Sequence, residues 1–329
     1  MKNIWITWED HRRSRELAES FDAEYIFAKS PKNRLAKYIY STVLTLYLIA
    51  RKSPDNVFCQ NPSVMLAYVV VLMKKFFRYK AIVDRHSNFK IDKLDDGSLK
   101  WRIFHYLSNY SLSNADITIV TNGYAKDYIS SLARSVAILP DRIPKIECKA
   151  CSEKFEVDVA KKKKVLFVTT FDDDEPINEM LEAAKSLDSV NVYLTGNYKK
   201  KFSESEVIEF KRHDIIFTGF VPNSVYETLL CESDLVVVLT DKDLILNCGA
   251  YEALSLNKPL ILSNTKTLKS YFGGPGIIYV NNSRLDILGG INEALPSLDV
   301  MKSNIVERRK EIDKDWQSKK DDLMSLIHH

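Results

Sequence analysis

The chain has 329 residues, of which 45% are hydrophobic and 28% are charged, and its formal net charge is +3. This length is enough for two domains of ordinary size, and the composition is that of a folded protein rather than a disordered one. The small net charge gives no reason to expect a nucleic-acid partner.

The first half of the chain alternates short β-branched runs with longer helical segments. This alternation is typical of a parallel sheet built from βαβ units. Strands are predicted at residues 4–8, 57–59, 81–84, 116–121 and 136–139, and helices at residues 14–21, 38–50, 64–73 and 101–113.

Two of these predicted helices, Tyr38–Ala50 and Val64–Met73, are strongly apolar and are flanked by lysines and arginines. Neither reaches the roughly 18 to 20 apolar residues that are needed to cross a bilayer. Two interpretations stay open. The helices are either buried in an α/β core, or they form a basic and apolar surface that associates peripherally with an anionic membrane.

Residues 143–164 carry a proline, mixed charges and a run of four lysines, which predicts a linker or a solvated lead-in to a strand. The alternating pattern then restarts. Strands are predicted at residues 165–169, 190–195, 215–217, 235–239, 260–262 and 276–280, and helices at residues 177–187, 225–231, 250–256 and 304–327.

Two successive series of similar size predict an α/β protein with two doubly wound domains. We expect an N-terminal domain at residues 1–155 and a second domain at residues 156–303. A C-terminal helix at residues 304–329 follows, and it could pack back on the first domain.

The five cysteines, Cys59, Cys148, Cys151, Cys231 and Cys248, are too few and too scattered to predict a disulfide framework. The chain also starts without a secretory signal pattern, so we expect a reducing cytoplasm. Cys148 and Cys151 have the spacing of half a zinc site, but no second pair exists, so no metal is predicted there.

The stretch from Asn247 to Ser263 carries most of the functional information. A glycine-containing loop at Asn247, Cys248 and Gly249 leads into a helix, whose free N–H groups and dipole suit a phosphate. A carboxylate at Glu252 can accept hydrogen bonds from the two vicinal hydroxyls of a ribose. The alternatives are a capping carboxylate at Glu252 and an ordinary turn at Gly249.

This stretch resembles the nucleotide-binding segment of GT-B fold glycosyltransferases, especially those of the family 4 type. Thr218–Pro222 and the residues that follow are similar to the glycine-phenylalanine segment of the same family. Together the similar motifs cover residues 165–285. The resemblance implies two Rossmann-like doubly wound domains with an interdomain cleft, a nucleotide diphosphate-sugar as the donor substrate, and no metal or other cofactor.

The resemblance also implies which residues bind the donor. They are Glu252, Gly249, Asn247, Cys248, Ala250, Gly219, Phe220, Thr170, Gly196 and Asn197. Two departures leave the sugar and the stereochemistry open. Leu244 stands where the family has a glutamate that touches the sugar, and the acidic residues 172–175 stand where the family has an arginine and a lysine. The acidic residues lie in the wrong place for the metal-binding DxD motif of the other glycosyltransferase fold.

In the first half, two predicted strands end on reactive side chains. Asp84 and His86 are the arrangement expected of a general base or a sugar ligand, with a satisfied loop pair as the alternative. Glu9 is a second candidate base. The candidates for binding the acceptor or a phosphate are His11, Arg12, Arg13 and Asn122, although Asn122 could simply start a helix.

The resemblance implies a metal-independent hexosyltransferase-like enzyme of bacterial surface polysaccharide synthesis. Its acceptor would be a glycan or a lipid-linked molecule, and its place would be the cytoplasm or the inner face of the cell membrane. The alternatives are a sugar-nucleotide epimerase, a phosphorylase, and a non-catalytic subunit that binds a sugar nucleotide or a glycan.

Overall fold

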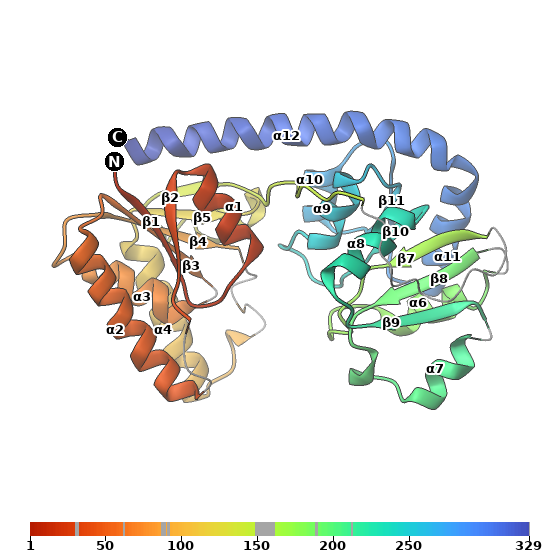
Figure 1. The fold of residues 1–329 in the computed structure, drawn as a ribbon, viewed down its shortest axis with the longest axis horizontal. Helices are drawn as coiled ribbons and strands as arrows, with labels where there is room; N and C mark the ends of the chain where they lie inside the picture. The colour runs from red at the N-terminus through yellow and green to blue at the C-terminus, as the bar shows by residue number, and fades with distance from the viewer. Residues whose placement is uncertain are drawn as a thin grey trace. The chain divides into compact units, whose positions relative to one another are not determined.

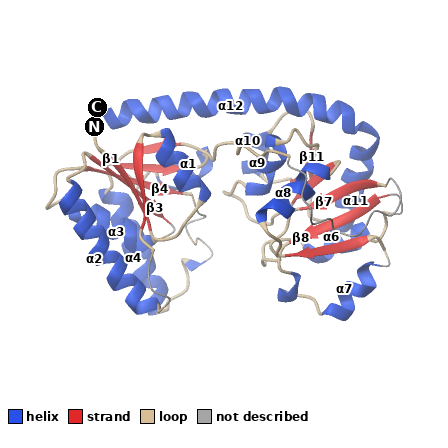
Figure 2. Ribbon diagram, in the orientation of Figure 1, coloured by secondary structure: helices blue, strands red, loops and turns tan. Residues whose placement is uncertain are grey.

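The computed structural model describes residues 1–29, 33–61, 63–86, 90, 93–148, 162–187, 190–211 and 213–328. The chain divides into two compact units, which are drawn in Figure 1. Unit 1 is Met1–Arg142 with Asp315–His329, and unit 2 is Ile143–Lys314. Each unit has a six-stranded parallel sheet between helices (Figure 2), so the predicted α/β class with two Rossmann-like domains is confirmed.

The sheet of unit 1 has the strand order β2-β1-β3-β4-β5-β6. Its strands are β1 (Asn3–Thr7), β2 (Ala23–Phe27), β3 (Asn56–Asn61), β4 (Lys80–Arg85), β5 (Ile117–Val120) and β6 (Val136–Ile138). Its helices are α1 (Arg12–Ser20), α2 (Arg34–Lys52), α3 (Val64–Met73), α4 (Leu99–Asn114), α5 (Gly123–Ile129) and the end of α12 (Leu298–His328).

Alternation along the strands explains the two-sided core of unit 1, because successive side chains of a strand point to opposite faces. On β1, Ile4 and Ile6 pack with α2 and α3, whereas Trp5 packs on the other face with α1. The end of α12 completes that second face, where Trp316 and Leu323 are buried.

Strand β2 was not predicted from the sequence. It lies at the edge of the sheet and pairs only with β1 among the described strands. None of its five residues is fully buried, so it lacks the continuous apolar run that marks the central strands.

The two apolar segments of unit 1 differ in their surroundings. Helix α3 is largely buried, as an α/β core helix should be. Helix α2 instead exposes a row of large side chains to solvent, namely Tyr38, Ile39, Tyr40, Val43 and Tyr47. In the part of the chain that is described, no helix has the combined length and apolarity needed to cross a membrane.

The sheet of unit 2 has the strand order β12-β11-β10-β7-β8-β9. Its strands are β7 (Lys163–Phe167), β8 (Val190–Thr195), β9 (Ile215–Gly219), β10 (Leu235–Val238), β11 (Leu260–Ser263) and β12 (Ile277–Val280). Its helices are α6 (Ile177–Ala184), η2 (Tyr198–Lys200), α7 (Glu204–Lys211), α8 (Asn223–Glu232), α9 (Cys248–Ser255), α10 (Lys266–Phe272), α11 (Arg284–Ala294), η3 (Leu295–Ser297) and the start of α12.

The order of strands reverses direction between β7 and β10, because β8 and β9 extend the sheet one way and β11 and β12 the other. Ligands of open α/β sheets bind beyond the carboxyl ends of the strands at such a point. In unit 1 the corresponding reversal lies between β1 and β3.

The division between the units falls after Arg142 and again after Lys314, rather than at residues 155 and 303. Ile143 belongs to unit 2 because it is buried in the core there, among residues of α8, α9 and β10. The last helix begins at Leu298, six residues before the start predicted from the sequence, and Met301 is buried in the core of unit 2.

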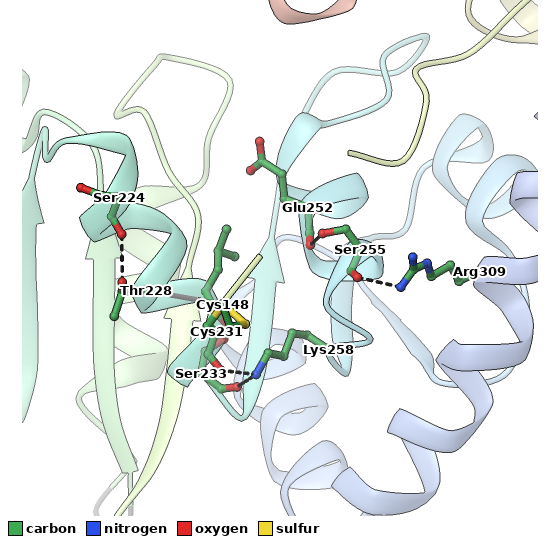
Figure 3. The surroundings of a disulfide bond; sticks show 10 residues. Cys148, Ser224, Thr228, Cys231, Ser233, Glu252, Ser255, Lys258 and Arg309 are labelled. Atoms are coloured by element: carbon green, nitrogen blue, oxygen red, sulfur yellow. Dashed lines mark hydrogen bonds between the residues drawn. A yellow bond between two sulfur atoms is a disulfide. The ribbon is translucent and has the colours of Figure 1, made fainter. Parts of the chain in front are cut away.

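A disulfide joins Cys148 to Cys231, whose Cα atoms are 5.7 Å apart (Figure 3). The expectation that the cysteines form no disulfide is therefore wrong for this pair. The two residues are 83 positions apart in the sequence, so their spacing gave no sign of the bond. The bond fastens the segment that follows unit 1 to the end of α8. Beside it, Lys258 donates hydrogen bonds to the carbonyl oxygens of Cys231 and Ser233.

We expect replacement of Cys148 and Cys231 by serine to lower the free energy of unfolding of unit 2 by about 2–4 kcal/mol, because the bond closes a long loop. Urea unfolding followed by far-UV circular dichroism measures the loss, and Cys248→Ser is the control because that thiol is exposed and outside the disulfide. Finding five titratable thiols in the denatured, unreduced protein would contradict the bond.

Candidate functional site

A cavity of unit 2 has a volume of about 840 Å³ and lies at the carboxyl ends of the strands, around the reversal between β7 and β10. Residues that directly follow β7, β8 and β9 line it, together with Val238 at the end of β10 and the start of α9. Of the donor residues predicted from the sequence, nine line this cavity: Glu252, Gly249, Asn247, Cys248, Gly219, Phe220, Thr170, Gly196 and Asn197. Ala250 is buried and does not line it.

Gly249 allows α9 to begin close to the sheet. A Cβ atom at this position would lie 2.9 Å from Val168 Cγ1 and 3.2 Å from Val238 Cγ2, so a larger residue would push the helix away from β7 and β10. The start of α9 therefore lies close to the reversal of the strand order, and Asn247, Cys248 and Gly249 line the cavity there. An anion is favoured at such a helix start.

Glu252 lines the cavity from α9 and is fixed from a second helix. The Tyr226 hydroxyl on α8 donates a hydrogen bond of 2.5 Å to Glu252 Oε2. The side chain is only partly buried, and the Glu252 carboxylate has lone pairs beyond the one that Tyr226 uses. Close by, Phe220 is 91% exposed after β9, which leaves the face of its ring open to stack on a flat ligand.

In the acidic loop after β7, an acidic side chain bonds to the backbone of the same loop. Glu175 accepts hydrogen bonds from the backbone N–H groups of Thr170 and Phe171, where φ is positive at Phe171. Burial raises the pKa of Glu175 above its ordinary value. Asp174 accepts hydrogen bonds from Thr240 and Lys242. Among the described residues, no group of three or more acidic, histidine or cysteine side chains could hold a metal ion.

One member of the cavity wall, Lys200, was not predicted from the sequence. It ends the short turn η2 after β8, and its Nζ atom lies 2.6 Å from Asp172 Oδ1 and 2.9 Å from the carbonyl oxygen of Thr170. The bond to Lys200 lowers the pKa of Asp172. Sequence reasoning passed over Lys200 because lysines in a loop usually face solvent.

Leu244, which replaces a glutamate of the family pattern, is not part of the cavity wall. Its φ of 65° is left-handed, and its N–H group bonds to Asp243 Oδ1 and Thr267 Oγ1. The loop before α9 is thus closed by Asp243 and Thr267, whose side chains also bond to each other. This position therefore supplies no carboxylate to the cavity.

In unit 1, Asp84 is fully buried at the end of β4 in an ion pair with Arg13 of α1. The Arg13 guanidinium also bonds to Asp141 and to the carbonyl oxygen of Leu139, so all three of its nitrogens are used. Arg13 lowers the pKa of Asp84 against the opposing effect of burial. This arrangement corrects the expectation that Arg13 meets a phosphate, because its guanidinium is enclosed and already bonded.

Asp84 also holds His86, whose Nδ1 atom lies 3.1 Å from Asp84 Oδ2. The ring of His11 stacks on that of His86, with centroids 5.2 Å apart. Burial, and after it the neighbouring His86, lowers the pKa of His11. Because Asp84 has no exposed surface, it cannot touch a substrate itself, and of this pair only His86 can present a ring nitrogen outward.

The other predicted residues of unit 1 have different surroundings. Glu9 is exposed and pairs with Lys37 at 3.2 Å. Arg12 lies near Glu16 on the surface of α1. Asn122 is buried and caps α5, since its side chain accepts a hydrogen bond from the N–H of Ala125. The alternative interpretation of Asn122, a residue that starts a helix, describes this geometry.

A smaller cavity of about 290 Å³ opens in unit 1 beside the reversal of its strand order. Trp8 and Glu9 line it just after β1, and the rest consists of apolar side chains of α2, α3 and α4, two lysines and Ser63. Its wall consists of Trp8, Glu9, Lys37, Tyr38, Ser63, Val64, Met65, Lys100, Ile103, Phe104 and Leu107.

Comparison with known proteins gives a family match for part of the chain and a fold for the whole of it. Residues 152–310 match the family described as Glycosyl transferases group 1. No curated protein matches the sequence of this chain.

Among solved structures, a sucrose-phosphate synthase from Thermosynechococcus elongatus is similar with a TM-score of 0.76 and 14% identity, over 100% of this chain and 98% of that one. A glycosyltransferase from Rickettsia africae gives a TM-score of 0.67 and 13% identity, over 99% and 89% of the two chains. Anabaena HepE in complex with UDP is similar with a TM-score of 0.66 and 12% identity, over 100% of both chains.

Proposed function

Residues 152–310 match the family described as Glycosyl transferases group 1 and the fold is similar to that of solved glycosyltransferases, and on this premise we propose that the protein moves a sugar from a nucleotide diphosphate-sugar to a glycan or lipid-linked acceptor. The proposed role is in surface polysaccharide synthesis in a bacterium. The observation that carries the proposal is the cavity of unit 2, where the start of α9 and Glu252 meet beyond the carboxyl ends of the strands.

In this proposal the diphosphate lies at the first turn of α9, beside Gly249, and the ribose bonds to Glu252. Phe220 and the backbone after Gly219 lie against the base. Support comes from the fold relatives, since Anabaena HepE, at 12% to 14% identity, has been solved with UDP, with UDP and glucose, and with UDP-glucose. The donor groups named here need no metal.

For unit 1 we propose that His86 meets the acceptor or the transferred sugar, with Asp84 as the residue that positions its ring. A buried carboxylate that accepts a hydrogen bond from Nδ1–H fixes the tautomer of a histidine and leaves the Nε2 lone pair available as an acceptor. Glu9 is the second candidate base, at the mouth of the smaller cavity. His11 and Arg12 are proposed to contact the acceptor or its phosphate.

We propose that the enzyme works at the inner face of the cell membrane. The exposed aromatic and aliphatic side chains of α2, including Tyr40 and Val43, lie on the same helix as Arg51 and Lys52. Anionic headgroups of the cytoplasmic leaflet attract such basic residues, and the apolar side chains can enter the interface. A lipid-linked acceptor would be found there.

The test is a thermal-shift series with UDP-glucose, GDP-mannose, ADP-glucose and dTDP-glucose, followed by release of nucleotide from the donor that binds. We expect one of them to raise the melting temperature, because a ligand at 100 times its Kd stabilises the folded state by about 2.7 kcal/mol. Vesicles of anionic phospholipid should bind the protein and those of phosphatidylcholine should not. Binding by none of the donors would contradict the proposal. Binding without nucleotide release would favour the non-catalytic subunit, and conversion of the sugar without an acceptor would favour the epimerase.

A further inference from the structure

The donor cavity has a charge that does not suit an anion. Four carboxylates belong to its wall, those of Asp172, Asp174, Glu175 and Glu252. The Lys200 side chain is the single cationic group of the described residues in the wall. A nucleotide diphosphate is an anion, so the field of these carboxylates opposes its entry unless they are neutralised.

Three of the four carboxylates have partners that hold them in place. Glu175 bonds to the backbone of its own loop, Glu252 accepts a hydrogen bond from Tyr226, and Asp174 bonds to Thr240 and Lys242. Lys242 does not belong to the cavity wall. Asp172 differs, because its cationic partner Lys200 is itself part of the wall.

The pair of Lys200 and Asp172 is well placed to exchange partners. Both side chains are about half exposed, at 43% and 60% of their surface, and an ion pair as exposed as this contributes little to stability. An ammonium group has three N–H donors, and here one of them bonds to the Thr170 carbonyl oxygen. Lys200 could therefore keep that bond while its other donors turn from Asp172 to a new acceptor.

We propose that Lys200 binds the diphosphate of the donor, leaving Asp172 when the nucleotide enters. This assignment rests on the proposed function and deepens it. A cation from the turn after β8 then supplies the charge that the acidic loop after β7 lacks. Together with the start of α9, it gives the diphosphate both an ammonium group and backbone N–H donors.

The experiment is isothermal titration calorimetry in the presence of EDTA, first with UDP, GDP, ADP, CDP and dTDP, and then with the nucleoside of whichever diphosphate binds best. We expect Lys200→Ala to weaken binding of the diphosphate about tenfold, as for loss of one bond to a charged group, and to leave binding of the nucleoside within about twofold. Lys200→Arg should recover most of the affinity. Asp172→Asn should bind the diphosphate at least as tightly as the wild type, because it removes the competing acceptor.

Lys201→Ala is the matched control. Lys201 is the next residue in the same loop and bonds to the carbonyl oxygen of Asp172, but it does not line the cavity. We expect the Lys201→Ala variant to bind the diphosphate and the nucleoside with the affinity of the wild type. Melting temperatures of all four variants check that the fold is kept.

Equal affinity of Lys200→Ala and the wild type for the diphosphate would overturn the assignment. So would an equal loss for diphosphate and nucleoside, which indicates a structural role. If the diphosphate binds only when Mg²⁺ replaces EDTA and Lys200→Ala has no effect, the carboxylates hold a metal instead. A wild type that binds none of the five diphosphates rejects the proposed function itself, and the lysine assignment with it.

Discussion

Replacing Arg13 by alanine is expected to lower the free energy of unfolding of unit 1 by about 3–5 kcal/mol. The substitution leaves Asp84 with no exposed surface and without its cation, and it also removes bonds to Asp141 and to the Leu139 carbonyl oxygen. An uncompensated charge in the interior is among the most destabilising changes a single substitution can make. Arg13 joins α1 to Asp84 on β4 and to Leu139 after β6. We therefore expect its removal to destabilise the whole sheet of unit 1 and not α1 alone.

Tryptophan fluorescence during urea unfolding measures this effect in unit 1 alone. All four tryptophans of the chain, Trp5, Trp8, Trp101 and Trp316, belong to that unit. Arg12→Ala is the control, since Arg12 is the neighbouring residue and its pair with Glu16 is on the surface. We expect a change below about 1 kcal/mol for Arg12→Ala. Similar urea midpoints for Arg13→Ala and Arg12→Ala would mean that the buried ion pair does not stabilise unit 1.

Replacing Glu252 by glutamine is expected to reduce kcat/KM for the donor by about 10- to 100-fold. The carboxylate can accept hydrogen bonds from both hydroxyls of a ribose, whereas an amide has one acceptor oxygen and carries no charge. The Tyr226 hydroxyl, which bonds to Glu252 Oε2, should keep the variant side chain in place. The loss should therefore come from binding rather than from misfolding.

A ligand without ribose hydroxyls separates this role from that of a capping carboxylate. We expect Glu252→Gln to lower the affinity for a nucleoside diphosphate but not the affinity for its 2′,3′-dideoxy form. Isothermal titration calorimetry measures both affinities. Glu232→Gln is the control, because Glu232 is on the outer end of α8 and pairs with Lys164. An equal loss for both ligands, or a fall in melting temperature without a change in affinity, would support the capping role.

Much of the fold could be predicted because it depends on local patterns. The short β-branched runs at residues 81–84 and 235–239 fall on the central strands β4 and β10, and the resemblance read from residues 247–263 is supported by the family match over residues 152–310. Strand β2 escaped prediction because it is an edge strand and its half-exposed residues lack an apolar run. Most of the predicted donor residues line one cavity because they lie in loops after strands or at the start of α9, and parallel strands end at one edge.

What the sequence determined by itself is the alternation of strands and helices, and hence two parallel sheets with polar loops at their carboxyl ends. Only the tertiary structure decided which polar groups meet. Arg13 and Asp84 lie 71 positions apart, Cys148 and Cys231 lie 83 apart, and Lys200 reaches Asp172 from a different loop. The physical reason is that periodicity reports which face of an element is buried, whereas an ion pair or a disulfide depends on packing that brings distant segments together. The acidic loop after β7, whose sequence lacks the arginine and lysine of the family pattern, thus acquires a cation from the turn after β8.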